Sequence, residues 1–329
     1  MAREKINWLL ILQGWAMLWV VIGHAPLGNL GEGPAYESIL YRIAYSFHMP
    51  LFMMVSGWLF YLTRLKSRGL NGGGKWSYGQ IIKDKALRLL LPGFVFSFVA
   101  YLFKIVFPSA VNRTVSFNIE EVLRTLLYPV ENPFQEIWFI ITLFFFFLLT
   151  PFWKFVLDRK WLMCCFLLVF TALFFYHPQT ELLCIGRICS HGIWFYLGLM
   201  ISKEDLVDKV ISKNSWAFLV LGLAVYILGY FTCDFIKIVG GIVFSVALAI
   251  IADIHFHELF SSFSNYTYQI FLMGIFSQVF VKIIYRSLSL PYIVSYVLCI
   301  LAGLYIPVLV SVVSKKINWK PLLICMGLK

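Results

Sequence analysis

Apolar runs of about 20 residues recur along the whole chain, separated by short charged segments. Such a run can cross a bilayer as a helix, because the hydrocarbon core is about 30 Å thick and a helix rises about 1.5 Å per residue. The composition agrees, with 61% hydrophobic and 13% charged side chains, against about 45–50% and 25% in soluble domains. The sequence predicts an all-α, polytopic helical membrane protein.

We expect ten spanning helices and no separate soluble domain, so that residues 1–329 form a single transmembrane domain. The seventh and eighth runs are divided only by "CDFIK". The runs are 6–26, 39–62, 89–107, 137–157, 161–177, 184–202, 216–233, 236–254, 265–284 and 291–313.

The distribution of Lys and Arg predicts the orientation of these helices. Ten spans put both termini on one side, and cytoplasmic loops are enriched in basic residues. With a cytoplasmic N-terminus, most of the 27 Lys and Arg fall in inner segments. The net charge of +11 is then explained by topology, and we expect no nucleic-acid partner.

The inner loop 63–88 contains "GGGK" but lacks the phosphate-binding pattern G-x-x-x-x-G-K-[ST]. A flexible basic connector is favoured over a site for an anionic cytoplasmic ligand. The seven cysteines and the histidines show no spacing typical of a zinc site, so we expect no metal.

Two histidines lie in the first two apolar runs, where ionisable groups are costly and indicate function. His24 and His48 are expected near the outer ends of neighbouring helices, where they can share a pocket. The alternatives are a packed imidazole bonded to a carbonyl for His24, and support of the Pro50 kink for His48. Gln13 precedes His24 by about three helical turns on the same face, roughly 16 Å away, and this polar stripe suits a long, thin ligand.

Other polar residues near span ends have simpler explanations. Arg187 and His191 are four residues apart on one helix face, and a structural pair at the outer interface is favoured over an acceptor pocket. Trp138 is typical of an interface anchor. Lys282, like other lysines near span ends, is expected to extend towards the membrane surface.

Five segments together resemble one protein family in the same order along the chain. They are "LQGWAMLWVVIGHA", "YSFHMPLFMMVSGWLF", "KALRLLLPGFVF", "EIWFIITLFF" and "GIWFYLGLMISK". They resemble the membrane acyltransferase family 3 proteins, which O-acetylate bacterial surface polysaccharides and related glycolipids. The second segment, residues 45–60, is the most specific.

The chain also departs from the pattern of this family. The family has a basic residue, ten intervening positions and then histidine, whereas Gln13 stands here at the basic position. Glu136 replaces a histidine often found before the Trp-Phe motif, and Met273-Gly274 replaces a late histidine. Arg88 is the candidate for the missing positive charge.

The resemblance implies an acetyl-CoA-dependent O-acyltransferase in a bacterial inner (plasma) membrane, acting on a cell-envelope glycan or glycolipid among membrane lipids. A glycan or lipid-linked-sugar exporter is the alternative, but it predicts paired broken helices in two similar halves, which the motifs do not show. An inactive relative retained for assembly is favoured only by the departures from the pattern. We expect catalysis at His24 and His48, donor binding at Gln13, Arg88, Lys83 and Lys85, and acceptor binding at Trp138, Glu136, Arg187 and His191.

Overall fold

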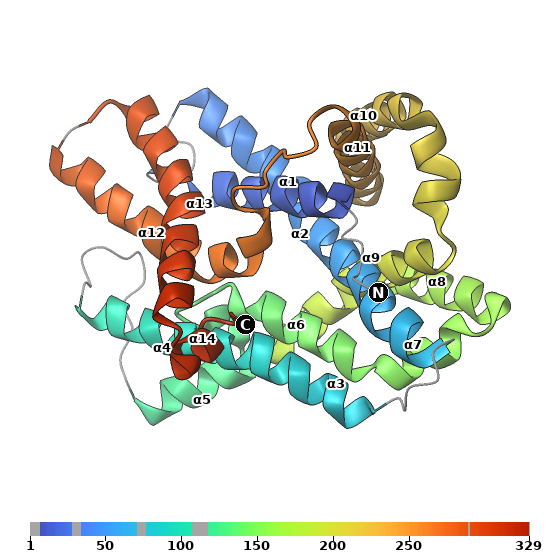
Figure 1. Ribbon diagram of the computed structural model, residues 1–329, viewed down its shortest axis with the longest axis horizontal. Coiled ribbons are helices and arrows are strands. Elements are labelled where there is room, and N and C mark those ends of the chain that lie inside the picture. Colours follow the sequence, from blue (N-terminus) through green and yellow to red (C-terminus); the bar gives the residue numbers. More distant parts are fainter. Residues whose placement is uncertain (1–6, 28–33, 71–76, 107–117, 289, 329) are drawn as a thin grey trace. The chain divides into compact units, whose positions relative to one another are not determined.

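The computed structural model describes residues 7–27, 34–70, 77–106, 118–288 and 290–328, and in these ranges its regular secondary structure is all helical (Figure 1). Eight helices of the described chain are long and apolar enough to span a membrane. A ninth span results if α6 (Ile137–Leu148) and α7 (Thr150–Leu157), bent by 56°, cross together. The prediction of a polytopic helical membrane protein is confirmed. The long spans are Asn7–His24, Ala35–Lys66, Tyr78–Val106, Leu182–Lys203, Val207–Phe231, Asp234–His255, Ser264–Tyr285 and Tyr292–Ile317.

The span count is therefore eight or nine, whereas ten runs were expected. The difference lies in α8 (Lys160–Phe175), which has 16 residues. Such a helix rises about 24 Å, less than the roughly 30 Å of a hydrocarbon core. The apolar run predicted at 161–177 is real, but its helix is short for a span.

The chain divides into two compact units, described separately here. Unit 1 comprises Met1–Val55 and Asp205–Lys316, and unit 2 comprises Ser56–Glu204 and Ile317–Lys329. The chain passes from one unit to the other inside helices as well as between them, since one boundary falls within α2 (Ala35–Phe60). That the whole chain acts as a single domain stays a prediction.

Unit 1 is built around α1 (Asn7–His24), which packs on α11 (Asp234–His255) and α12 (Thr267–Leu288). Polar side chains join these helices within an apolar unit. Trp15 Nε1 donates to Ser245 Oγ at 3.1 Å, and Gln278 Nε2 donates to the Val21 carbonyl at 2.8 Å. The remaining helices of unit 1 are the first part of α2, α10 (Ser215–Phe231) and α13 (Tyr292–Ile317).

Helices α10 and α11 pack tightly against each other at small residues. A Cβ on Gly222 would lie 2.4 Å from the Phe244 nitrogen, and one on Gly240 would lie 2.2 Å from the Tyr226 nitrogen. Only glycine permits backbones this close, and close backbone packing is a main source of helix association in membranes. The hairpin therefore depends on these two glycines.

Unit 2 has an aromatic core on α6, α7, α8 and α9 (Ile185–Lys203). Trp153 and Tyr196 are fully buried and stack at 5.9 Å. Their polar tips are satisfied, since Trp153 Nε1 donates to the Phe146 carbonyl at 2.6 Å and Tyr196 Oη donates to the Met163 carbonyl at 2.9 Å. The other helices of unit 2 are α3 (Tyr78–Lys85), α4 (Leu91–Val106), α5 (Ile119–Leu127) and α14 (Lys320–Cys325).

The segment 63–88, expected to be a flexible connector, is helical over most of its described length. A π-helix, η1 (Tyr61–Leu70), continues α2, and α3 runs directly into a second π-helix, η2 (Ala86–Leu90). The cause at η2 is Pro92: it has no N–H for the Arg88 carbonyl, and the Leu91 N–H instead bonds the Ala86 carbonyl five residues back. The "GGGK" of residues 71–76 lies outside the described residues.

Candidate active site

The two intramembrane histidines of unit 1 lie on either side of one tyrosine. His24 is the last residue of α1, and His48 lies in α2. The Tyr45 ring meets the His24 ring edge-on at 6.0 Å between centroids and the His48 ring at 5.1 Å. Tyr45 Oη lies 3.5 Å from His24 Nδ1. The structure thus brings together the two histidines that the sequence placed as neighbours, and adds Tyr45, which sequence reasoning missed.

His48 is 2% exposed, and its Nδ1 is hydrogen-bonded to the Ala44 carbonyl. A carbonyl only accepts, so Nδ1 carries a hydrogen and, in the neutral ring, Nε2 carries the lone pair. The carbonyl-bonded imidazole that the sequence raised as an alternative for His24 is therefore found at His48. One backbone contact sets the tautomer of this ring.

The end of α1 is held by side chains distant in sequence. Lys282 Nζ donates to the His24 carbonyl at 3.0 Å, and the Leu27 N–H donates to Glu37 Oε1 at 3.1 Å. The last carbonyls of a helix have no intrahelical partner, and a cation there also meets the negative end of the helix dipole. The Lys282 side chain is therefore directed to the end of α1, and its extension towards the membrane surface stays a prediction.

Glu37 is a buried carboxylate that sequence reasoning missed, because the second apolar run was drawn from residue 39. It is 1% exposed, and its Oε1 also accepts from the Tyr292 hydroxyl. Its Oε2 has no hydrogen-bond partner, and neither have the buried hydroxyls of Ser295 and Tyr296. In the sequence, the burial of Glu37 is indicated only by its position two residues before an apolar run.

Gln13 lies half-buried in the middle of α1, which is one continuous helix from Asn7 to His24. The expected spacing of about three turns between Gln13 and His24 therefore holds in the structure. The adjacent Gly14 packs against Phe260, whose Cβ would be 2.6 Å from a Cβ at Gly14. Whether the stripe from Gln13 to His24 binds a ligand stays a prediction.

The predicted donor-binding cations lie in unit 2, on consecutive turns of α3 and η2. Lys83 and Arg88 are exposed, whereas the Lys85 ammonium lies over the Phe147 ring at 3.9 Å from its centroid. The structure adds Arg64, which is 9% exposed, donates from Nη2 to Asp84 Oδ2 at 3.0 Å and has no partner for Nη1. The sequence around Arg64 gave no reason to predict a functional role for it.

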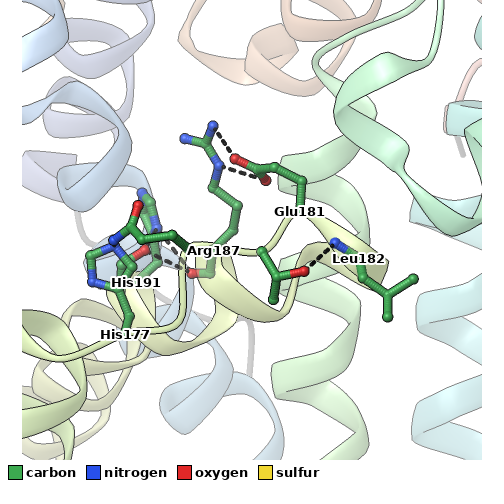
Figure 2. A network of polar contacts seen from close by, with 8 residues as sticks. His177, Glu181, Leu182, Arg187 and His191 are labelled. Atoms are coloured by element: carbon green, nitrogen blue, oxygen red, sulfur yellow. Dashed lines mark hydrogen bonds and ion pairs between the residues drawn. The ribbon is translucent and has the colours of Figure 1, made fainter.

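Three of the four predicted acceptor-binding residues meet at the start of α9. Arg187 forms two hydrogen bonds with Glu181, at 3.0 and 3.3 Å, and its backbone carbonyl lies 3.0 Å from His191 Nδ1 (Figure 2). The Trp138 ring lies 5.1 Å from the Arg187 guanidinium and 5.3 Å from the His191 ring. The sequence favoured a structural pair of Arg187 and His191 on one helix face. It did not predict that Glu181 and Trp138 also contact this pair.

Glu136, the fourth of these residues, immediately precedes α6, and its side chain makes no capping hydrogen bond to the helix. Burial raises the pKa of its carboxyl to about 7, and Lys104 opposes that shift. The cause is desolvation, which disfavours the charged form of a carboxylate. We therefore expect the Glu136 carboxyl to change its charge near neutral pH.

Within the described chain, no group of three or more His, Cys, Asp or Glu residues is arranged to hold a metal ion.

Comparison with known proteins identifies the family of this chain. Neither the curated proteins nor the solved structures give a match. Residues 6–312 match the family model of the acyltransferase domain of acyltransferase family 3. Since that match covers most of the chain, this membrane protein belongs to acyltransferase family 3.

Proposed function

We propose that this protein is an integral-membrane O-acyltransferase that moves an acetyl or other short acyl group from acyl-CoA to a hydroxyl of a cell-envelope glycan or glycolipid. The observation that carries the proposal is the pair of histidines flanking Tyr45 in unit 1. Ionisable side chains inside a membrane segment are rare and mark functional sites. Family membership supports acyl transfer as the reaction class.

In this proposal His24 is the general base. In this role Nδ1, which lies 3.5 Å from Tyr45 Oη, carries the hydrogen of the neutral ring, and Nε2 takes the proton of the acceptor hydroxyl. The acceptor oxygen attacks the thioester carbon, the C–S bond breaks, and the departing thiolate takes the proton from the imidazolium. A positioned base of this kind contributes roughly 10²–10⁴-fold.

His48 is the second catalytic residue in this proposal. Its Nδ1 is held by the Ala44 carbonyl, so Nε2 is the ring atom available to accept a hydrogen bond from a reacting group. A ring held by backbone does not reorganise during the reaction, which is the property wanted in an active site. Gln13, in the same helix as His24, hydrogen-bonds the donor where the family has a cation.

The donor is anionic, and the cations of unit 2 suit its phosphates. Lys83 and Arg88 are exposed, and Arg64 has one buried, unpartnered nitrogen. Arginine forms bidentate, charge-assisted bonds to phosphate. The Lys85 ammonium lies 5.5 Å from the centre of the Phe60 ring and 3.9 Å from that of Phe147. It attracts the phosphates of the donor through its positive charge more than by direct hydrogen bonds.

The acceptor side of the proposal uses Trp138, Glu136, Arg187 and His191. In this proposal the chain crosses the membrane an even number of times, so that both termini are cytoplasmic, and the membrane is the bacterial inner membrane, as the charge distribution and the resemblance favour. On that topology the cations of residues 83–88 face the cytoplasm, where acyl-CoA is made. Residues 24 and 187 are then both at the outer ends of their predicted spans.

The test uses the purified full chain in detergent micelles with acetyl-CoA. Wild type, His24→Ala and Gln13→Arg are compared for donor binding by calorimetry and for thiol release. His255→Ala is the matched control, since His255 is exposed at the end of α11. Donor binding with turnover that needs His24 supports the proposal. Absence of donor binding, even in Gln13→Arg, rules it out.

A further inference from the structure

A pocket of about 220 Å³ opens at the N-terminal end of α9, within unit 2. All its lining residues but a proline and a glycine carry polar side chains. The polar lining of this pocket contrasts with the apolar helices around it. The lining residues are His177, Pro178, Gln179, Thr180, Glu181, Gly186, Arg187 and Ser190.

The pocket is tightly built. The loop before α9 folds directly over Gly186, because a Cβ there would lie 2.7 Å from the carbonyl oxygens of Pro178 and Thr180. The Gly186 N–H donates to the Thr180 carbonyl at 3.1 Å. Leu183 and Cys184 have positive φ angles of 48° and 59°. Strained backbone of this kind persists where the surroundings hold it, often at ligand-binding sites.

The charges of the pocket cancel. Arg187 binds both oxygens of Glu181. An anionic ligand would meet the Glu181 carboxylate, and a cationic one would meet the Arg187 guanidinium. Each group keeps capacity for a neutral ligand, because a guanidinium has five N–H donors and a carboxylate about four acceptor sites. The pair therefore favours groups that both donate and accept, as hydroxyls do.

Arg187 is also fixed from a second direction. Its guanidinium lies 5.1 Å from the centre of the Trp138 ring, and the same ring contacts His191. Gln179 and His177 contact each other at 3.3 Å, and His177 Nδ1 is bonded to the Phe174 carbonyl at 2.8 Å. Polar groups held in place in advance lose less conformational entropy when a ligand binds.

We propose that this pocket binds one neutral, polyhydroxylated ring, a single uncharged sugar residue. Its volume of about 220 Å³ is below the roughly 300–1,000 Å³ of pockets for drug-sized ligands, which suits one ring. That this ring belongs to the acyl acceptor rests on the proposed function; the binding itself does not.

The test is saturation-transfer NMR on the purified full chain. The probes are the methyl pyranosides of glucose, galactose, mannose and N-acetylglucosamine, with glucuronate as the anionic probe. Wild type should bind at least one neutral probe and not glucuronate. Glu181→Gln should weaken binding of the neutral probe by about tenfold, because it removes the charged acceptor for the hydroxyl groups of the ligand, and it should allow glucuronate to bind.

Two further variants keep the result interpretable. Glu131→Gln removes the acid of a similar ion pair in the same unit, where Arg124 Nε and Nη2 bond Glu131 at 2.6 and 3.1 Å, and it should leave sugar binding unchanged. Gln179→Ala alters an exposed side chain of the pocket and should weaken the neutral probe even if Glu181→Gln does not fold.

Three results would overturn the proposal: no binding of any neutral probe, preference of wild type for glucuronate, or an equal effect of Glu131→Gln. Acetyl-CoA turnover by wild type, measured separately, tests the proposed function. Sugar binding without any turnover would overturn that function and leave the pocket assignment standing.

Discussion

The Lys282 ammonium donates a hydrogen bond to the main-chain carbonyl of His24 at 3.0 Å, across 258 positions of sequence. The contact caps the C-terminal end of α1, where the carbonyls lack helical partners. It also fixes the backbone of the residue that we propose as the base. The position of that imidazole is therefore set by α12 as well as by its own helix.

Replacing Lys282 with methionine keeps the length of the side chain and removes the donor. We expect kcat for acetyl transfer to fall about tenfold, because loss of one hydrogen bond from a charged group costs about 1.5–3 kcal/mol and frees the His24 backbone. The KM for acetyl-CoA should change less than twofold, and Lys282→Arg should restore most of kcat. Lys315→Met, at an exposed lysine of the same unit, is the control. An unchanged kcat in Lys282→Met would contradict this role.

Removal of the Glu37 side chain should destabilise unit 1. Glu37→Ala leaves the Leu27 N–H and the Tyr292 hydroxyl without their acceptor, and we expect the free energy of unfolding to fall by roughly 2–5 kcal/mol. Glu37→Gln keeps an accepting oxygen and should lose only about 1 kcal/mol. Denaturant titration in micelles measures both, with Glu258→Ala at an exposed glutamate as the control. Equal losses in the Ala and Gln variants would disprove the acceptor role.

Glu136 should make stability depend on pH. Burial raises the pKa of its carboxyl from 4.5 to about 7, so the folded state binds more protons than the unfolded state between these values. The free energy of unfolding should therefore fall as pH rises from about 4.5 to 7, by at most about 3 kcal/mol. The measurement is the difference between wild type and Glu136→Gln at each pH. A difference that stays constant, or grows in favour of wild type with rising pH, would show that the carboxyl is not buried in this way.

Donor affinity should depend on salt through the exposed cations. Arg88→Gln and Lys83→Gln should each raise the Kd for acetyl-CoA about two- to fivefold at low ionic strength, as expected for exposed charges. The effect should vanish near 0.5 M salt, because screening then acts over about 4 Å. Lys213→Gln, at an exposed lysine outside this cluster, should change nothing. If Arg88→Gln matches that control at low salt, these residues do not hold the donor.

The helical membrane architecture was predictable from sequence because it rests on a local property. A run of about twenty apolar residues has few alternatives to a helix, since every backbone polar group must be bonded within the segment in lipid. The same local reasoning placed His24 and His48 on neighbouring segments and Gln13 three turns from His24. It overestimated the ability of the run 161–177 to span the membrane, because α8 has only 16 residues and ends before that run does.

The contacts around the site depended on tertiary packing. Tyr45, Lys282, Glu37 and Arg64 gained their significance from partners that the sequence does not place nearby, such as the His24 carbonyl for Lys282 and the Tyr292 hydroxyl for Glu37. Likewise Arg187 meets Glu181 only because the loop before α9 turns back over Gly186. Hydrophobic patterning determines which segments are buried, since that depends on each segment alone. The pairing of buried polar groups depends on which helices become neighbours, and that is decided only when the chain packs.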